Sequence, residues 1–175
     1  MDLIVFSGLP GTGKSSVAEA VGRKLSIPVF AKDWLEASIL RCGLGQNLEY
    51  SATLGEIGNE LLTTLTLRQF YLGQSAILDS VAKIEMIRQK WRTLARIHNA
   101  NWRVIECVCS DELIHRDRLS TRRRGIPGWY ELTWSDIEQV RARYEPWQDE
   151  RLILDSTNSL DHNIQAALRY LSNGK

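Results

Sequence analysis

A glycine-rich stretch near the start of this 175-residue chain has the residue types and spacing of a phosphate-binding loop. Residues 8–15 read GLPGTGKS and fit the pattern G-x-x-x-x-G-K-[ST] at every fixed position. Glycine tolerates positive φ and has no side chain, so such a loop can curl with its N–H groups pointing inward, where they hold phosphate oxygens. The predicted nucleotide contacts are Gly8, Pro10, Gly11, Thr12, Gly13, Lys14, Ser15 and Ser16.

Two side chains at the end of this stretch add chemistry that the backbone cannot supply. Lys14 would bridge the β and γ phosphates of a bound nucleotide as a point charge, and it is a predicted catalytic residue. The Ser15 hydroxyl would ligate Mg²⁺. An apolar run at residues 3–6 precedes the loop and a helical pattern at residues 17–25 follows it. A strand, a glycine loop and a helix in this order are the context in which the motif binds phosphate.

Two aspartates stand directly after predicted strands. Asp33 follows the short apolar run 28–31, where its carboxylate could accept the proton of an attacking hydroxyl; the alternative is a helix N-cap. Asp79 ends the apolar run 76–79 as a Walker B aspartate does, and there it would hold Mg²⁺ beside Ser15. The alternatives for Asp79 are a turn or cap role and a contact with the acceptor. We therefore expect Asp33 to be catalytic and Asp79 to be a metal ligand.

The second concentration of charged residues is a group of five arginines between positions 116 and 124. Guanidinium groups suit the negative charge that phosphoryl transfer spreads over the phosphate oxygens. Arg118 and Arg122 are four residues apart, so they would share one helix face and both contact the nucleotide, with Arg122 also catalytic. We expect residues 116–134 to form a lid that excludes water. The alternatives are a solvated basic helix and a patch for a nucleic-acid acceptor.

The elements that must position these residues alternate between strands and helices. Apolar runs predict strands at 3–6, 28–31, 76–79, 102–108 and 152–155. Periodic patterns predict helices at 51–72, 83–99 and 159–172, a helix capped by Ser110 that runs through the arginines, and one from Ser135 to Tyr144. Fully apolar strands indicate a parallel sheet covered on both faces, whose ligands bind at the carboxyl ends of the strands. We predict one α/β domain over residues 1–175, with three layers and a five-stranded parallel sheet.

Composition sets limits on the partners. The net charge is +1, so nothing draws the whole chain to nucleic acid or to a membrane surface. No apolar run is long enough to span a membrane, and the N-terminal strand does not resemble a signal peptide, so we expect a cytoplasmic protein. An odd count of three cysteines, without metal spacing, indicates reduced thiols. We expect surface positions for the histidines, which are His98, His115 and His162.

Together, the glycine loop, Asp33, Asp79 and the arginine segment resemble small P-loop kinases. The likeness is to the group that contains the kinase domain of phage polynucleotide kinase, chloramphenicol phosphotransferase and the zeta toxins. Residues 117–123, DRLSTRR, also resemble the lid entrance of adenylate kinases, in which one arginine packs on adenine and the next contacts phosphates. The resemblance implies a nucleoside-monophosphate-kinase-like P-loop NTPase fold, ATP and Mg²⁺. It also implies these roles for Arg118 and Arg122 and a general-base role for Asp33.

The resemblance and the residues together predict an ATP- and Mg²⁺-dependent kinase that phosphorylates a hydroxyl group. In polynucleotide kinases a second acidic residue and then a basic one often follow the catalytic aspartate, whereas Trp34, Leu35 and Glu36 follow Asp33 here. A small or nucleotide-like acceptor is therefore favoured over a nucleic acid, and a polynucleotide 5′-hydroxyl kinase is the alternative. A non-kinase NTP-hydrolysing regulator is the other alternative, although neither an N-K-x-D motif nor a D-x-x-G switch after Asp79 is found.

Overall fold

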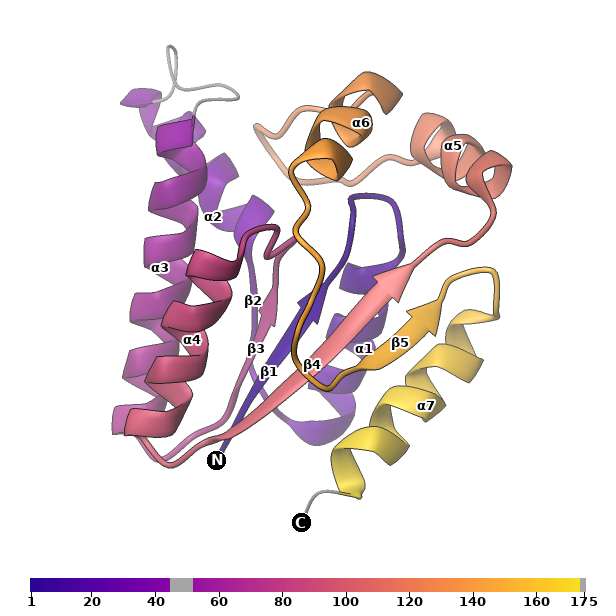
Figure 1. Cartoon of the computed structure of the whole chain (residues 1–175). Coiled ribbons are helices and arrows are strands. Elements are labelled where there is room, and N and C mark those ends of the chain that lie inside the picture. The colour runs from indigo at the N-terminus through magenta and orange to yellow at the C-terminus, as the bar shows by residue number, and fades with distance from the viewer. Residues whose placement is uncertain (45–51, 174–175) are drawn as a thin grey trace.

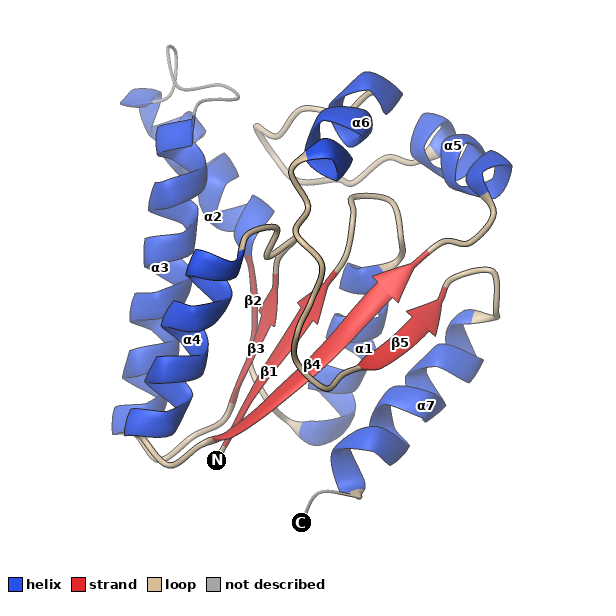
Figure 2. Cartoon of the chain, viewed as in Figure 1, coloured by secondary structure: helices blue, strands red, loops and turns tan. Residues whose placement is uncertain are grey.

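The computed structural model describes residues 1–44 and 52–173 and contains a five-stranded, fully parallel sheet (Figure 1, Figure 2). The strand order across the sheet is β2-β3-β1-β4-β5. The strands are β1 (Asp2–Ser7), β2 (Val29–Ala31), β3 (Ala76–Asp79), β4 (Asn101–Val108) and β5 (Leu152–Asp155). The predicted α/β P-loop NTPase fold with a five-stranded parallel sheet is thereby confirmed.

Seven α-helices and one short π-helical segment, η1 (Leu40–Leu44), surround the sheet in the described part of the chain. The α-helices are α1 (Lys14–Leu25), α2 (Lys32–Ile39), α3 (Ala52–Tyr71), α4 (Glu85–Ile97), α5 (Glu112–Thr121), α6 (Trp134–Ala142) and α7 (Leu160–Ser172). Figure 1 shows α5 and α6 beyond the carboxyl ends of the strands, where ligands bind in parallel sheets. Among the described residues, no helix combines the length and the apolar character needed to cross a membrane.

Both faces of the central strand β1 are buried, which explains its continuous apolar sequence. Ile4 and Phe6 pack with α1 and α7 on one face of the sheet. Leu3 and Val5 pack with α3 and α4 on the other face. All four side chains are at most 1% exposed, so the alternating direction of side chains along a strand divides the run between two cores.

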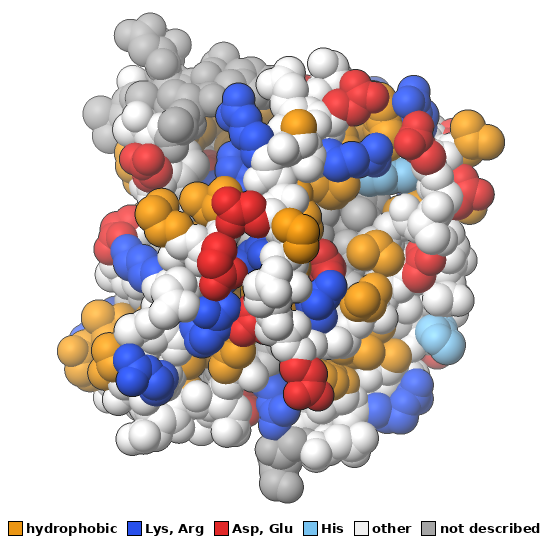
Figure 3. Space-filling view, viewed as in Figure 1, with side chains coloured by type: hydrophobic (Ala, Val, Ile, Leu, Met, Phe, Trp, Pro, Cys, Tyr) orange, Lys and Arg blue, Asp and Glu red, His pale blue; other side chains and the backbone are white. Residues whose placement is uncertain are grey.

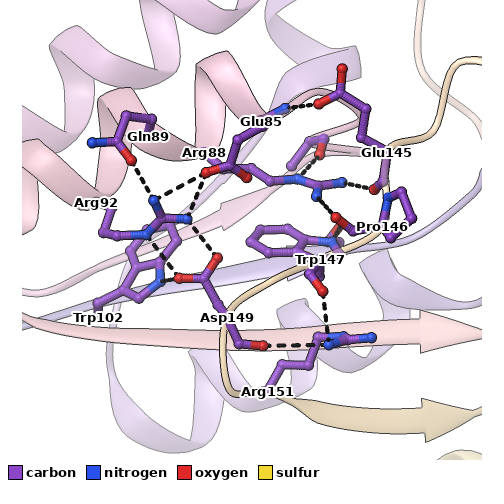
Figure 4. Close-up of polar contacts among 12 residues, drawn as sticks. Glu85, Arg88, Gln89, Arg92, Trp102, Glu145, Pro146, Trp147, Asp149 and Arg151 are labelled. Atoms are coloured by element: carbon purple, nitrogen blue, oxygen red, sulfur yellow. Dashed lines mark hydrogen bonds and ion pairs between the residues drawn. The ribbon is translucent and has the colours of Figure 1, made fainter.

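Part of the second face is covered by an irregular segment, residues 143–151, which we call the strap (Figure 4). The fully buried Arg88 side chain of α4 donates to the strap carbonyls of Glu145 and Pro146 and to the carbonyl of Ala82. Its guanidinium carbon lies 4.0 Å from the centre of the Trp147 ring. One arginine thus holds the strap, α4 and the loop after β3 together, because its fixed fork of donors can reach several carbonyls at once.

The arginine-containing helix is shorter than the sequence pattern predicts. The side chain of Asp111, not that of Ser110, caps α5 by accepting from the N–H of Ile114. The helix ends at Thr121, and Arg122 is its C-cap with extended backbone. Helix α6 is capped by Thr133 in a capping box with Asp136, not by Ser135, and it ends at Ala142 before Tyr144. These helix limits were wrong because several neighbouring residues could serve as caps.

Candidate active site

The glycine loop between β1 and α1 is held in a conformation that its sequence makes accessible. Gly8 has a φ of 132°, and a Cβ atom placed there would lie 2.0 Å from the carbonyl oxygen of Cys107. Only glycine fits this close approach of two backbones. The Thr12 hydroxyl closes the loop by donating to the carbonyl of Leu9 at 2.8 Å. Helix α1 begins at Lys14, so its N-terminal dipole points at the space enclosed by the loop.

Lys14 and Asp79 bring opposite charges into the buried floor of the site. Their residues are 6% and 5% exposed. Asp79 ends β3 and is paired in register with Phe6 of β1, directly beside the start of the loop. Burial raises the pKa of the Asp79 carboxyl, while Lys14 and a hydrogen bond from Ser15 offset part of that rise. The structure therefore brings together the three side chains that the sequence assigned to phosphate and metal binding.

The Ser15 and Asp79 oxygens fit the role of magnesium ligands. The Oδ1 atom of Asp79 is buried and has no hydrogen-bond partner. A bound cation would provide the partner that this buried oxygen lacks. Magnesium prefers oxygen ligands and is usually held by only one or two protein groups together with phosphates and water. In residues 1–44 and 52–173, no three His, Cys, Asp or Glu side chains form a metal cluster, in keeping with such a shared site.

Asp33 lies in the first turn of α2, at the mouth of the strand next to Asp79. Ala31, two residues before Asp33, is paired in register with Asp79. This pairing places the carboxylates of Asp33 and Asp79 at the same edge of the sheet. The N-cap of α2 is Ala31, so Asp33 does not have the N-cap role that was the alternative. Its Oδ2 atom forms an ion pair with Arg124. Burial would raise the pKa of the Asp33 carboxyl, but Arg124, Lys14 and Lys32 together hold it below its ordinary value, so this carboxylate is ionised at neutral pH.

Arg118 and Arg122 line one pocket of about 380 Å³ with the glycine loop and the loop after β5. The backbone N–H of Arg122 donates to the carbonyl of Arg118, which keeps the two residues adjacent although Arg122 lies outside the helix. The Nε atom of Arg122 is buried and has no hydrogen-bond partner. An unpaired cationic donor of this kind can form a hydrogen bond to an anionic oxygen of a ligand. The pocket also contains Gly11, Thr12, Gly13 and Ser16.

Sequence reasoning placed Arg124 in the basic cluster but assigned it no role. In the structure, this arginine reaches from the predicted lid segment, residues 116–134, to Asp33, and its side chain is only 10% exposed. The predicted lid segment also contacts η1, because Arg41 donates to the carbonyl of Pro127. The partner of Asp33 lies 91 residues along the chain, and the spacing of residues in a sequence carries no signal for such a contact.

The predicted surface position of His115 was wrong. It is 2% exposed and not on the surface, and its Nε2 atom lies 2.8 Å from the carbonyl oxygen of Pro10. It lines a second hollow, of about 350 Å³, together with Leu9, Cys109 and Tyr144. Asp33 does not line this hollow, so we do not assign the hollow to the acceptor.

Comparison with known proteins gives the family. A family model described as "AAA domain" matches residues 3–147, more than half of the chain, including the glycine loop, Asp33, Asp79 and the arginines. The chain belongs to the AAA domain family. The UPF0200 protein of Aeropyrum pernix is 31% identical to it over 146 residues, which are 79% of this chain and 74% of the relative.

Solved structures show the same fold as this AAA domain protein. A sugar kinase from Janibacter has a TM-score of 0.74 at 16% identity, with 99% of this chain and 96% of the kinase covered. A gluconokinase from Sinorhizobium meliloti has a TM-score of 0.68 at 20% identity, covering 98% and 92%. The likeness shows that this AAA domain protein shares the α/β P-loop NTPase fold of these structures.

Acidic and basic side chains are interspersed over the face of the molecule that Figure 3 shows. Binding to nucleic acid depends on clustered Lys and Arg side chains that neutralise several phosphates. The mixed face and the net charge of +1 give no general attraction for a polyanion. The positive charge of the site is instead local, in Lys14, Arg118, Arg122 and Arg124.

Proposed function

We propose that this AAA domain protein transfers the γ-phosphoryl group of ATP to a hydroxyl group of a small or nucleotide-like acceptor, with Mg²⁺ as the cofactor. The observation that carries the proposal is the placement of the ionised Asp33 carboxylate beside Lys14 and Asp79 at one edge of the sheet. A site that only binds nucleotide does not need a second, partly buried carboxylate just after the neighbouring strand. A kinase needs one to accept and orient the proton of its acceptor.

The residues divide the work between binding and transfer. The loop N–H groups and Lys14 would hold the β and γ phosphates. Arg118 would pack on the adenine and Arg122 would contact phosphate oxygens. In support, both residues line the pocket beside the glycine loop, and the buried Nε atom of Arg122 has no hydrogen-bond partner. Ser15 and Asp79 would hold Mg²⁺, which supplies positive charge to the phosphate oxygens when bound.

Asp33 would act on the acceptor. The acceptor oxygen forms a bond to the γ-phosphorus as the bond to the leaving ADP oxygen breaks, and the hydroxyl proton passes to the Asp33 carboxylate. Arg124 contacts Oδ2 of Asp33, so Oδ1 is the atom that we assign to the acceptor proton. Arg124 also keeps the carboxylate ionised, which a proton acceptor requires.

The test is whether an acceptor stimulates ADP formation. Purified protein would be incubated with Mg·ATP and a panel of acceptors that includes sugars, sugar acids, nucleosides and an oligonucleotide with a 5′-hydroxyl end. We expect at least one small acceptor to raise ADP release and to become labelled from [γ-³²P]ATP. Labelling of the oligonucleotide alone would give the polynucleotide alternative. ADP release that no acceptor changes, with labelled inorganic phosphate as the product, would contradict the proposed function and support a hydrolysing regulator.

A further inference from the structure

His115 joins the first lid helix, α5, to the outer side of the phosphate loop. Its ring lies in the interior, and its Nε2 atom is 2.8 Å from the Pro10 carbonyl oxygen. A carbonyl oxygen can only accept a hydrogen bond, so Nε2 must carry the hydrogen in this contact. The bond connects residues 105 positions apart, and it is made to the backbone of the loop itself.

The imidazole ring also packs directly on the loop. A Cβ atom added at Gly11 would lie 2.9 Å from Nε2 and 3.0 Å from Cδ2 of His115, so no side chain could occupy that position without displacing the ring. Gly11 has a φ of 89°, in the region that favours glycine. The ring and the hydrogen bond together brace the turn at Pro10 and Gly11.

The His115 ring is also contacted by a residue of the second lid helix, α6. The Trp134 ring meets the His115 ring edge to face, with centroids 5.2 Å apart and planes at 84°. Arg116 and Arg141 lie over Trp134 at 4.4 Å and 5.2 Å from its ring centre, and both form ion pairs with Glu112. Side chains of α5 and α6 therefore pack around Trp134, which in turn packs on His115.

We propose that His115 is a positioning residue that couples the conformation of the phosphate loop to the position of the lid. A nucleotide that fixes the conformation of the loop thereby fixes the positions of α5 and α6. Arg122 and Arg124 lie in the segment that connects these two helices. The effect runs through the Pro10 carbonyl and the Trp134 ring, and His115 does not itself touch the reacting atoms. This inference rests on the proposed function, because it requires that the loop and the lid serve the same nucleotide.

The first test compares two substitutions that are matched in length. Gln retains an N–H donor at position 115 and Met does not, so His115→Gln should bind Mg·AMPPNP within about threefold of the wild type, while His115→Met should bind it about tenfold more weakly, as expected for one unmade bond to a buried carbonyl. His98→Met is the control, since His98 contacts Phe70 and Tyr71, away from the loop. Equal binding by the Gln and Met variants would overturn the proposal.

A second measurement reads the coupling to the lid. Arg123 is exposed, so trypsin can cleave the lid there. We expect Mg·AMPPNP to slow this cleavage in the wild type, in His115→Gln and in His98→Met, but much less in His115→Met at a nucleotide concentration that saturates each protein. A role in core packing alone predicts equal protection at saturation, and that result would overturn the coupling.

A third measurement needs only the wild type, in case the variants do not fold. Nitrogen-edited NMR of the imidazole groups should show one Nε2–H that exchanges slowly with water, and its resonance should shift when Mg·AMPPNP binds. A rapidly exchanging or unshifted resonance would overturn the proposal. If the wild type bound no Mg·AMPPNP at all, the proposed function itself would fail, and the coupling with it. Loss confined to His115→Met is thus distinguishable from failure of the proposed function.

Discussion

Arg124 of the lid and Asp33 at the start of α2 form an ion pair across the candidate active site. The Arg124 side chain is 10% exposed and the Asp33 side chain 27% exposed, so the pair is partly shielded from water. This contact gives the lid a direct effect on the residue proposed to receive the acceptor proton. It also means that the predicted lid segment lies against Asp33 in the conformation described.

Replacing Arg124 by Met should weaken catalysis more than nucleotide binding. Without the guanidinium, Asp33 loses its ion-pair partner, and the pKa of its carboxyl rises because only Lys14 and Lys32 then oppose the effect of burial. We expect kcat/KM for the acceptor to fall about tenfold to hundredfold, the range for loss of one hydrogen bond to a charged group, while the Kd for Mg·AMPPNP changes less than about threefold. Arg123→Met is the matched control, because Arg123 is exposed. An equal loss in both variants would count against the pair.

Replacing Lys14 by Met should weaken both nucleotide binding and catalysis. Lys14 is the buried cation of the phosphate loop, so its loss should weaken the binding of Mg·AMPPNP and lower kcat by about a hundredfold or more. Isothermal titration calorimetry gives the first quantity, and release of ADP gives the second. Lys24→Met, on the exposed end of the same helix, should leave both unchanged. Normal nucleotide affinity in Lys14→Met would contradict the assignment of the loop.

Adding a single methyl group at Gly8 should prevent the loop from forming. The Cβ atom of Ala would lie 2.0 Å from the Cys107 carbonyl oxygen, so β1 and β4 would have to move apart. We expect Gly8→Ala to lower the free energy of unfolding by more than about 3 kcal/mol, measured by urea denaturation. Gly73→Ala is the control: Gly73 also has a positive φ, of 71°, but a Cβ there meets nothing within 4 Å, so it should cost about 1 kcal/mol. Similar losses of unfolding free energy in the two variants would show that the close approach of Gly8 to the Cys107 carbonyl does not determine the effect.

Asp149 should make the stability of the strap depend on pH. Its carboxylate accepts from Arg92 and from the Trp102 indole (Figure 4). Burial opposes ionisation, but these hydrogen bonds dominate and hold the pKa of Asp149 below 3.8. A carboxyl with a lowered pKa stabilises the folded state above its unfolded pKa, and that contribution is lost as the pH falls through the folded pKa.

Substitution of Asp149 by Asn is therefore expected to cost about 1 kcal/mol at neutral pH. The difference between wild type and Asp149→Asn should stay constant above about pH 5 and shrink below about pH 4. Urea denaturation at a series of pH values measures it. Glu150→Gln, at an exposed neighbouring position, should show no such dependence. A difference that grows as the pH falls would mean that the pKa is raised and not lowered.

The sequence contained enough information to predict the sheet and the centre of the site, because both depend on local patterns. Runs such as residues 3–6 and 76–78 are apolar throughout, as is typical of strands buried on both faces. The glycine motif between the first strand and its helix fixed Lys14 and Ser15. Asp79 could be placed because it ends a strand next to β1, and the shared edge of a parallel sheet then brings it to Ser15.

The lid could not be predicted in the same detail, because its contacts are tertiary. Ser110 and Asp111 are both good caps, and only the folded chain selects Asp111. A polar histidine in an exposed-looking helix gave no sign that the Pro10 carbonyl would bury it. Arg118, Arg122, Arg123 and Arg124 are alike in the sequence, and they differ only in what the fold places opposite them.

The most direct test of the account is the kinetic effect of Asp33→Asn. Asn has nearly the same size as Asp but cannot accept the acceptor proton, so transfer to the acceptor should fall by at least about a hundredfold while the Kd for Mg·AMPPNP stays within about threefold of the wild type. The two quantities would be measured on the same preparations, by transfer from [γ-³²P]ATP and by calorimetry. That result would support Asp33 as the group that receives the acceptor proton. Undiminished transfer in Asp33→Asn would contradict the central claim.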